Sequence, residues 1–228
     1  SGAKVQIKPM GLSHNRRNCD FSFEDEFLFT PPSPLFRDKV AKLLTKVKKQ
    51  NIILFSGKVG NEKNQLKFVE MIEPNLCRDY SFVFAGTNTA EYHYKKQVEN
   101  ECRRKGINFY MLGHVDFEHM PYFTTLAKLH VINCDPRPYG QPYDPIPRCL
   151  GECAISNTHS ICSKTTLYNE ELSQYVTSYD HESSAALNGA FELALKIDTS
   201  SYHANLITLE QKCYNMTKII MKKSSIDV

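Results

Sequence analysis

The sequence predicts an α/β fold in which helices cover both faces of a parallel sheet. Short, continuously apolar runs of the kind found in fully buried strands recur along the chain, and segments with helical periodicity separate them. The length of 228 residues suits one large or two small domains and is enough to bury a core without disulfide bonds.

The predicted strands end in small or polar residues. They are Ile52–Phe55 (followed by Ser56-Gly57), Phe82–Gly86, Ile107–Gly113, Leu129–Asn133 and Ser160–Cys162. Ligands of such sheets bind beyond the carboxyl ends of the strands, near the reversal in strand order. Small residues at these ends leave the backbone open to a ligand.

Helical patterns are expected between and after these strands. They cover residues 34–47, 66–72, 91–105, 117–129, 149–155, 187–194 and 209–220. The charged pattern over 91–105 ends at Gly106, a typical helix C-cap. Residues 1–32 lack such periodicity, so we expect a linker-like extended segment there and a single domain over residues 33–228.

The charge balance argues against nucleic acid as a partner. The chain has 28 Lys and Arg against 25 Asp and Glu, a net charge of +3. The basic clusters Lys46–Lys49 and Arg103–Lys105 fall at the ends of predicted helices, where they complement the helix dipole. No apolar run approaches the ~18 residues of a membrane-spanning helix, so we expect no transmembrane segment.

The eight cysteines show no CxxC pair and no regular spacing. We interpret them as buried free thiols in a reducing compartment, which predicts a cytoplasmic protein. Cys149, Cys153, His159 and Cys162 are the right residue types for a zinc site, but their spacing fits no common pattern, and we expect no metal.

The turn after the first predicted strand reads Ser56-Gly57-Lys58-Val59-Gly60-Asn61-Glu62-Lys63. It is not a P-loop, because GxxxxGK[ST] is absent. It places Lys58 and Lys63 five residues apart across a tight turn that opens a helix, where free N–H groups and partial positive charge favour anions. This arrangement indicates a diphosphate site, and two solvated surface lysines are the alternative.

This segment resembles the start of the C-terminal, nucleotide-sugar-binding domain of GT-B fold retaining glycosyltransferases (group 1, or family 4-like). The shared pattern is an apolar strand, Gly, a basic residue, and a short turn with Glu-Lys. The resemblance implies a Rossmann-like domain, one half of a GT-B enzyme. It also implies that Gly57 lines the donor site and that Lys58 and Lys63 hold the pyrophosphate.

Two flanking segments extend the resemblance. Residues 7–12 are similar to the family's interdomain linker, and residues 108–115 are similar to its third strand. The resemblance implies that backbone groups near Gly113, His114 and Val115 meet the nucleobase.

Asp144 and Glu152 stand eight residues apart and resemble the family's pair of acids, Glu-x7-Glu. The resemblance implies that Glu152 accepts hydrogen bonds from the ribose hydroxyls, and that Asp144 holds the transferred sugar and stabilises oxocarbenium-like charge. The glycine-rich segment that normally follows the first acid is missing. Asp135 or Tyr139-Gly140 are therefore alternative counterparts of that acid.

The resemblance implies a metal-independent hexosyl- or deoxyhexosyltransferase with no cofactor beyond its substrate. It would take a nucleoside-diphosphate sugar, UDP-linked by preference, and transfer the sugar to a hydroxyl of a glycan or another acceptor. Further domains of the same polypeptide would complete the cleft. Two alternatives are a nucleotide-sugar-binding module without turnover and a GT-B-fold epimerase or hydrolase. The latter would need an acid–base pair, with His114, His119 and His159 as candidates.

Overall fold

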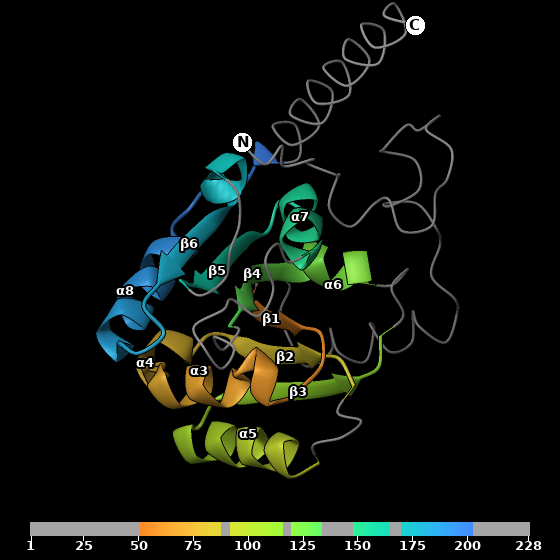
Figure 1. Cartoon of the computed structure of the whole chain (residues 1–228), viewed down its shortest axis with the longest axis vertical. Helices are drawn as coiled ribbons and strands as arrows, with labels where there is room; N and C mark the ends of the chain where they lie inside the picture. Colours follow the sequence, from red (N-terminus) through yellow and green to blue (C-terminus); the bar gives the residue numbers. More distant parts are fainter. Residues whose placement is uncertain (1–50, 88–91, 116–119, 134–147, 165–169, 203–228) are drawn as a thin grey trace, which may run out of the picture.

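Six strands form one sheet in the computed structural model (Figure 1), and all five pairings between them are parallel. The structure describes residues 51–87, 92–115, 120–133, 148–164 and 170–202. The strands are β1 (Ile52–Ser56), β2 (Ser81–Ala85), β3 (Asn108–Gly113), β4 (Ala127–Ile132), β5 (His159–Ser163) and β6 (Val176–Tyr179).

The strand order is β3-β2-β1-β4-β5-β6. The chain builds the sheet outward from β1 to β3 and then returns to place β4 against the other side of β1. The reversal of strand order therefore lies between β1 and β4, in the middle of the sheet, as in doubly wound folds that bind nucleotides at this point.

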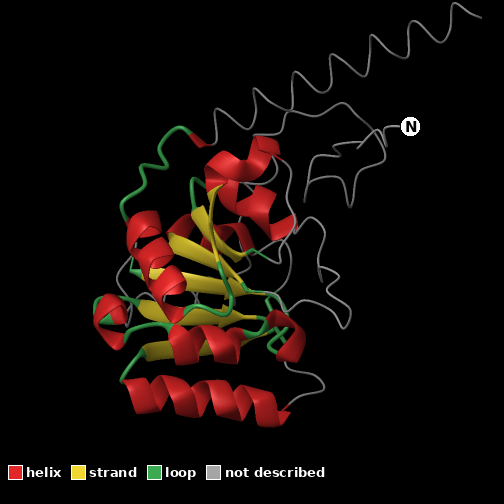
Figure 2. Ribbon diagram, turned by 60° about the vertical axis from the view of Figure 1, so that its left-hand side comes forward, coloured by secondary structure: helices red, strands yellow, loops and turns green. Residues whose placement is uncertain are grey.

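Helices cover both faces of the sheet (Figure 2). One face packs against α3 (Gln65–Met71), α4 (Pro74–Cys77), α5 (Tyr92–Lys105) and α8 (Ser184–Leu195). The other face packs against α6 (Met120–Leu126), α7 (Arg148–Ile155) and the short 3-10 helix η3 (Glu170–Tyr175). Another short 3-10 helix, η1 (Asn61–Lys63), precedes α3.

The predicted fold class is confirmed, because all five predicted strands are present and helices separate them. The helix predicted over 91–105 is confirmed as α5, and Gly106 behind it has the left-handed φ of +68° that a C-cap glycine adopts. The basic residues at its end lie where the dipole favours them, and the Lys105 ammonium donates to the carbonyl oxygen of Ile72 at 2.8 Å.

Some local predictions were wrong or incomplete. The helix predicted over 117–129 runs too far, since α6 ends at Leu126 and β4 begins at Ala127. The short elements α4, η3 and β6 were not predicted. The expected helices over 34–47 and 209–220 and the linker-like segment 1–32 lie outside the described residues.

The five cysteines that the structure describes are free thiols, and four of them are buried. Burial raises the pKa of Cys77 and that of Cys102 to about 12, so both are uncharged at neutral pH. Within the described ranges no group of three or more His, Cys, Asp or Glu side chains has the geometry to bind a metal ion. None of the described helices has the length and apolar character needed to span a bilayer.

Candidate functional site

The candidate site lies at the carboxyl ends of β1 and β4, where the strand order reverses. The turn Ser56–Lys63 follows β1 at this edge, and Asn133 follows β4. In open α/β sheets a crevice forms here, because the connections from the two central strands leave in opposite directions.

Two glycines bring the ends of β1 and β2 together. Gly57 is exposed and has a φ of +101°, a left-handed conformation that other residues rarely adopt. A Cβ on Gly86 would lie 1.7 Å from the carbonyl oxygen of Gly57, so only glycine fits there. The amide of Gly57 donates to the Ala85 carbonyl at 2.9 Å, and the two ends are thereby fixed against each other.

A buried glutamine closes the turn after Gly57. The Gln65 side chain donates to the Lys58 carbonyl at 2.9 Å and accepts from the Gly60 amide at 3.3 Å. The Val59 amide donates to the carbonyl of Thr87. The amides of Gly57, Val59 and Gly60 therefore have acceptors within the protein, which differs from the open turn expected from the sequence.

The two predicted lysines have different surroundings. The Lys58 ammonium pairs with the carboxylate of Glu62, with Nζ 3.2 Å from Oε1, and its side chain is one-third exposed. Lys63 ends η1, and its positive charge contributes to the lowered pKa of His130 in β4. Lys63 is therefore within electrostatic range of the β1–β4 boundary.

A fully buried histidine, which was not among the predicted site residues, lies at this boundary. His130 Nε2 is 2.7 Å from Ser56 Oγ, and Nδ1 is 3.5 Å from Ser160 Oγ in β5. Burial, and secondarily the charge of Lys63, lower the pKa of His130 to about 3. The imidazole is therefore neutral at physiological pH. A polar residue inside the apolar run 129–132 was the available signal.

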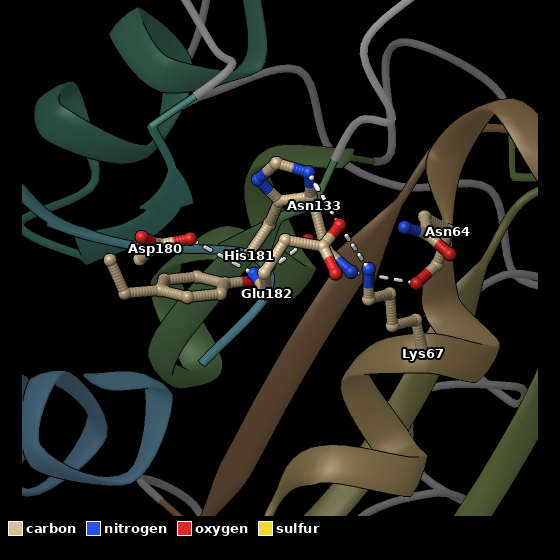
Figure 3. Close-up of polar contacts among 7 residues, drawn as sticks. Asn64, Lys67, Asn133, Asp180, His181 and Glu182 are labelled. Carbon is tan, nitrogen blue, oxygen red and sulfur yellow. Dashed lines mark hydrogen bonds and ion pairs between the residues drawn. The ribbon is translucent and has the colours of Figure 1, made fainter. Parts of the chain in front are cut away.

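Asn133 ties the two sides of the boundary together (Figure 3). Its side-chain amide donates to the carbonyl of Asn64 at 2.7 Å, and its side-chain oxygen accepts from the Tyr179 hydroxyl at 2.6 Å. Asn64 has a left-handed φ of 48° at the junction of η1 and α3. These bonds fix the start of α3, and with it the turn that carries Lys63, to the ends of β4 and β6.

A second polar group borders the site at the end of β6 (Figure 3). The Glu182 carboxylate lies 2.7 Å from the Lys67 ammonium of α3 and 3.0 Å from Nε2 of His181. The Glu182 amide donates to Asp180 Oδ1 at 3.0 Å, which shapes the turn. Because the Glu182 side chain is 68% exposed, we assign these contacts little stabilising weight.

The predicted nucleobase-binding residues lie at the end of the edge strand β3. Gly113 has a φ of +72° with open space where a side chain would project, His114 is exposed and Val115 is half-buried. β3 is two strands away from β1, which corresponds to about 10 Å at the usual strand spacing.

Of the two predicted acids, the structure describes Glu152 and not Asp144. Glu152 is buried, with 8% of its surface exposed, in the middle of α7 rather than at its start. Asp144 lies outside the described residues, as do its alternatives Asp135 and Tyr139-Gly140 and the candidate base His119.

His159 has a structural environment rather than that of an accessible acid–base group. Its Nδ1 is 2.6 Å from the Tyr202 hydroxyl and its Nε2 is 2.8 Å from the Thr177 hydroxyl. Burial, and secondarily the charge of Lys128, lower the pKa of His159 to about 4.

Comparison with solved structures identifies the fold. A glycosyltransferase from Rickettsia africae matches with a TM-score of 0.61 and 14% identity over 86% of this chain and 53% of its own. HepE from Anabaena, solved with UDP and glucose, matches with a TM-score of 0.60 and 14% identity over 88% of this chain and 55% of its own. The C-terminal domain of LpcC, a group 1 glycosyl transferase from Francisella tularensis, matches with a TM-score of 0.57 and 14% identity over 81% of this chain and 97% of the domain.

The fold of this chain is thus that of the C-terminal half of a GT-B glycosyltransferase, which confirms the predicted resemblance in fold. The chain spans about half the length of HepE and of the Rickettsia enzyme and corresponds to nearly the whole isolated LpcC domain. No protein-family model and no curated protein matches it by sequence.

Proposed function

We propose that this chain is the donor-binding domain of a metal-independent glycosyltransferase that uses a nucleoside-diphosphate sugar, UDP-linked by preference. The observation that carries the proposal is the turn that ends in Lys63, which the hydrogen bond from Asn133 to the Asn64 carbonyl fixes at the β1–β4 boundary of a GT-B donor-domain fold. An ammonium group at this edge suits a diphosphate, since a charge-assisted hydrogen bond contributes about 1.5–3 kcal/mol.

In this proposal the nucleotide lies along the carboxyl edge of the sheet. The base meets the end of β3 near Gly113, the diphosphate meets Lys58 and Lys63, and the ribose hydroxyls meet Glu152. Lys58 exchanges its ion pair with Glu62 for a phosphoryl oxygen. The two lysines then supply the charge neutralisation that a divalent cation provides in other transferases.

The transfer step forms a bond between an acceptor oxygen and the anomeric carbon. The bond from that carbon to the diphosphate breaks, and its electron pair stays with the departing nucleoside diphosphate. The acceptor hydroxyl passes its proton to a phosphoryl oxygen of the departing diphosphate. Asp144 would stabilise the positive charge that develops on the sugar, and the acceptor would be held mainly by a further domain.

The first experiment measures binding of UDP and of uridine to the full chain by calorimetry, with and without a chelator. We expect UDP to bind more tightly than uridine, with no effect of the chelator. Lys63→Ala should weaken UDP binding about ten- to a hundredfold and leave uridine unchanged. Lys196→Ala, an exposed lysine at the end of α8 away from this edge, is the control. Equal losses for UDP and uridine would contradict the diphosphate site.

The ribose contact is tested with Glu152→Gln. We expect a loss of about 1.5–3 kcal/mol for UDP, because the carboxylate no longer accepts two hydroxyl donors. The analogue lacking both ribose hydroxyls should bind wild type and variant equally. A loss that is the same for both ligands would remove the ribose role.

Turnover distinguishes an enzyme from a binding module. Slow hydrolysis of the donor sugar, lost in Asp144→Asn while UDP affinity is kept, supports catalysis. Tight UDP binding with no donor consumed under any condition supports the module without turnover.

A further inference from the structure

A line of polar side chains crosses the sheet underneath the proposed donor site. It runs from Ser56 at the end of β1 through His130 in β4 to Ser160 in β5, on the face that α6 and α7 cover. The neighbours of His130 in its own strand, Leu129 and Val131, are buried apolar residues. A buried imidazole costs free energy unless it is hydrogen-bonded, so its presence among them requires an explanation.

The contacts of His130 are unequal. The bond to Ser56 is short, at 2.7 Å, and the contact with Ser160 is long, at 3.5 Å. His130 and Ser160 are both fully buried, while Ser56 is partly exposed. The end of the line that reaches the surface is therefore Ser56, and the strong bond of the histidine is made to that end.

Two independent features place this exposed end where an anion would bind. Ser56 immediately precedes Gly57, which is exposed and has a left-handed φ of +101°. Lys63 ends the turn that follows Ser56, and the hydrogen bond from Asn133 to the Asn64 carbonyl holds the end of that turn beside the end of β4. The turn therefore carries both the Ser56 hydroxyl and the Lys63 ammonium at the boundary between β1 and β4. A hydroxyl beside an ammonium suits a phosphoryl oxygen.

We propose that Ser56 is a further phosphoryl-contacting residue of the donor site and that His130 is the positioning residue that orients its hydroxyl. This inference rests on the proposed function. With its hydrogen on Nε2, the imidazole donates to Ser56 Oγ, and the Ser56 hydroxyl is then directed to donate to a phosphoryl oxygen. The lowered pKa of His130 keeps the imidazole neutral, so its single hydrogen stays committed to this bond.

The same pair does not suit nucleophilic catalysis. A base works best when its pKa is near the operating pH, and the pKa of His130 is about 3. Nδ1 of His130 faces the Ser160 hydroxyl, whereas a catalytic histidine is usually oriented by a carboxylate. The arrangement therefore favours a fixed hydrogen-bond donor over an activated serine.

The test compares the two serines at opposite ends of His130 in the full chain. Calorimetry gives the affinity ratio of UDP to uridine, which isolates the diphosphate contribution and which a merely structural role would not change. We expect Ser56→Ala to lower this ratio about tenfold by weakening UDP alone. Ser160→Ala, which removes a hydroxyl without access to ligand, should leave the ratio within twofold.

Variants of His130 test the positioning role. Gln offers a neutral N–H near the position of Nε2, whereas Leu offers none. We expect His130→Gln to keep the UDP-to-uridine ratio and His130→Leu to lower it as Ser56→Ala does. If His130→Leu does not fold, the 15N NMR spectrum of the wild-type imidazole decides, and hydrogen on Nε2 is the expected result.

Each contrary outcome is distinct. If Lys63→Ala abolishes the preference for UDP and Ser56→Ala does not, this inference fails and the proposed function stands. If wild type shows no preference for UDP over uridine, both fail. Hydrogen on Nδ1, or donor hydrolysis that Ser56→Ala abolishes without loss of affinity, would overturn the positioning role.

Discussion

The two halves of the sheet, which meet between β1 and β4, bury different kinds of side chain. On the side of β1 and β2 the buried strand residues are apolar apart from Ser81, and the rings of Phe55 and Phe84 stack with centroids 4.6 Å apart. On the other side, strands β4 and β5 and the residue that follows β4 bury several polar side chains: His130, Asn133, His159, Ser160 and Ser163.

The halves also close their carboxyl edges differently. The first half brings β1 and β2 together through backbone alone, at Gly57 and Gly86. The second half relies on side chains, of which Asn133 is the central one. We infer that steric changes should damage the first half most, and that changes of protonation or hydrogen bonding should damage the second.

The largest expected effect is steric and lies in the first half. Gly86→Ala would place a Cβ 1.7 Å from a backbone oxygen, so the ends of β1 and β2 must separate. We expect a loss of at least about 3 kcal/mol in the free energy of unfolding, measured by urea denaturation.

Gly189→Ala in α8 is the matched control, because a Cβ there has no atom within 4 Å. Alanine is the better helix former, so this variant should gain about 0.5–1 kcal/mol. Similar losses in both variants would show that the contact between the two strand ends does not matter.

The second prediction concerns pH and the second half. The pKa values of His130 and His159 are lowered to about 3 and about 4, below the 6.5 of the unfolded chain. Between about pH 4 and 6.5 both histidines are therefore protonated in the unfolded state but remain neutral in the folded state. The stabilisation that comes from keeping these two histidines neutral is fully present above about pH 6.5. The free energy of unfolding should fall by about 1.4 kcal/mol per pH unit for each histidine as the pH drops towards 4.

Urea unfolding of wild type and of His159→Gln between pH 7 and 5 measures this effect. The variant starts less stable, but its stability should depend less steeply on pH by about one histidine's share. An unchanged slope would mean that His159 is protonated equally in both states.

The smallest expected effect is the difference in stability between removing the hydroxyl of Tyr202 and removing that of Tyr175. The centroids of these two rings lie 4.8 Å apart in the second half of the sheet. Tyr202→Phe removes the hydroxyl that bonds His159, so we expect a loss of about 1–3 kcal/mol. The Tyr175 hydroxyl is buried and has no hydrogen-bond partner among the described residues. Tyr175→Phe should therefore be neutral or slightly stabilising in thermal denaturation. A larger loss at Tyr175 than at Tyr202 would reverse this ranking.

The difference between the halves also explains which elements were predictable. β1 and β2 are continuous apolar runs, and α5 ends at a C-cap glycine, so local pattern was enough. β6 has only four residues, Val176–Tyr179, of which one is fully buried, so it carries no apolar run. The start of β4 was misplaced because Ala127 to Leu129 continue the helical pattern of α6.

The residues of the candidate site also fall into two groups, those that local sequence can indicate and those that only the fold brings together. Gly57, Lys58 and Lys63 could be named as candidates because they lie in one short segment of the chain that follows a recognisable strand. Ser56 and His130 are 74 residues apart, and neither shows its role without the other. Pairing of this kind depends on strand order, which local sequence does not specify.

Local sequence was sufficient to predict the α/β class, the position of the turn after β1 and the free state of the described thiols. These follow from periodicity, glycine placement and composition, which act over a few neighbouring residues. Three features depend on long-range packing instead. β4 returns beside β1, the neutral His130 lies within hydrogen-bond distance of the Ser56 hydroxyl, and Asn133 joins the start of α3 to β6. Parallel pairing brings these groups together from distant parts of the chain, and burial then sets their charge and their hydrogen bonds.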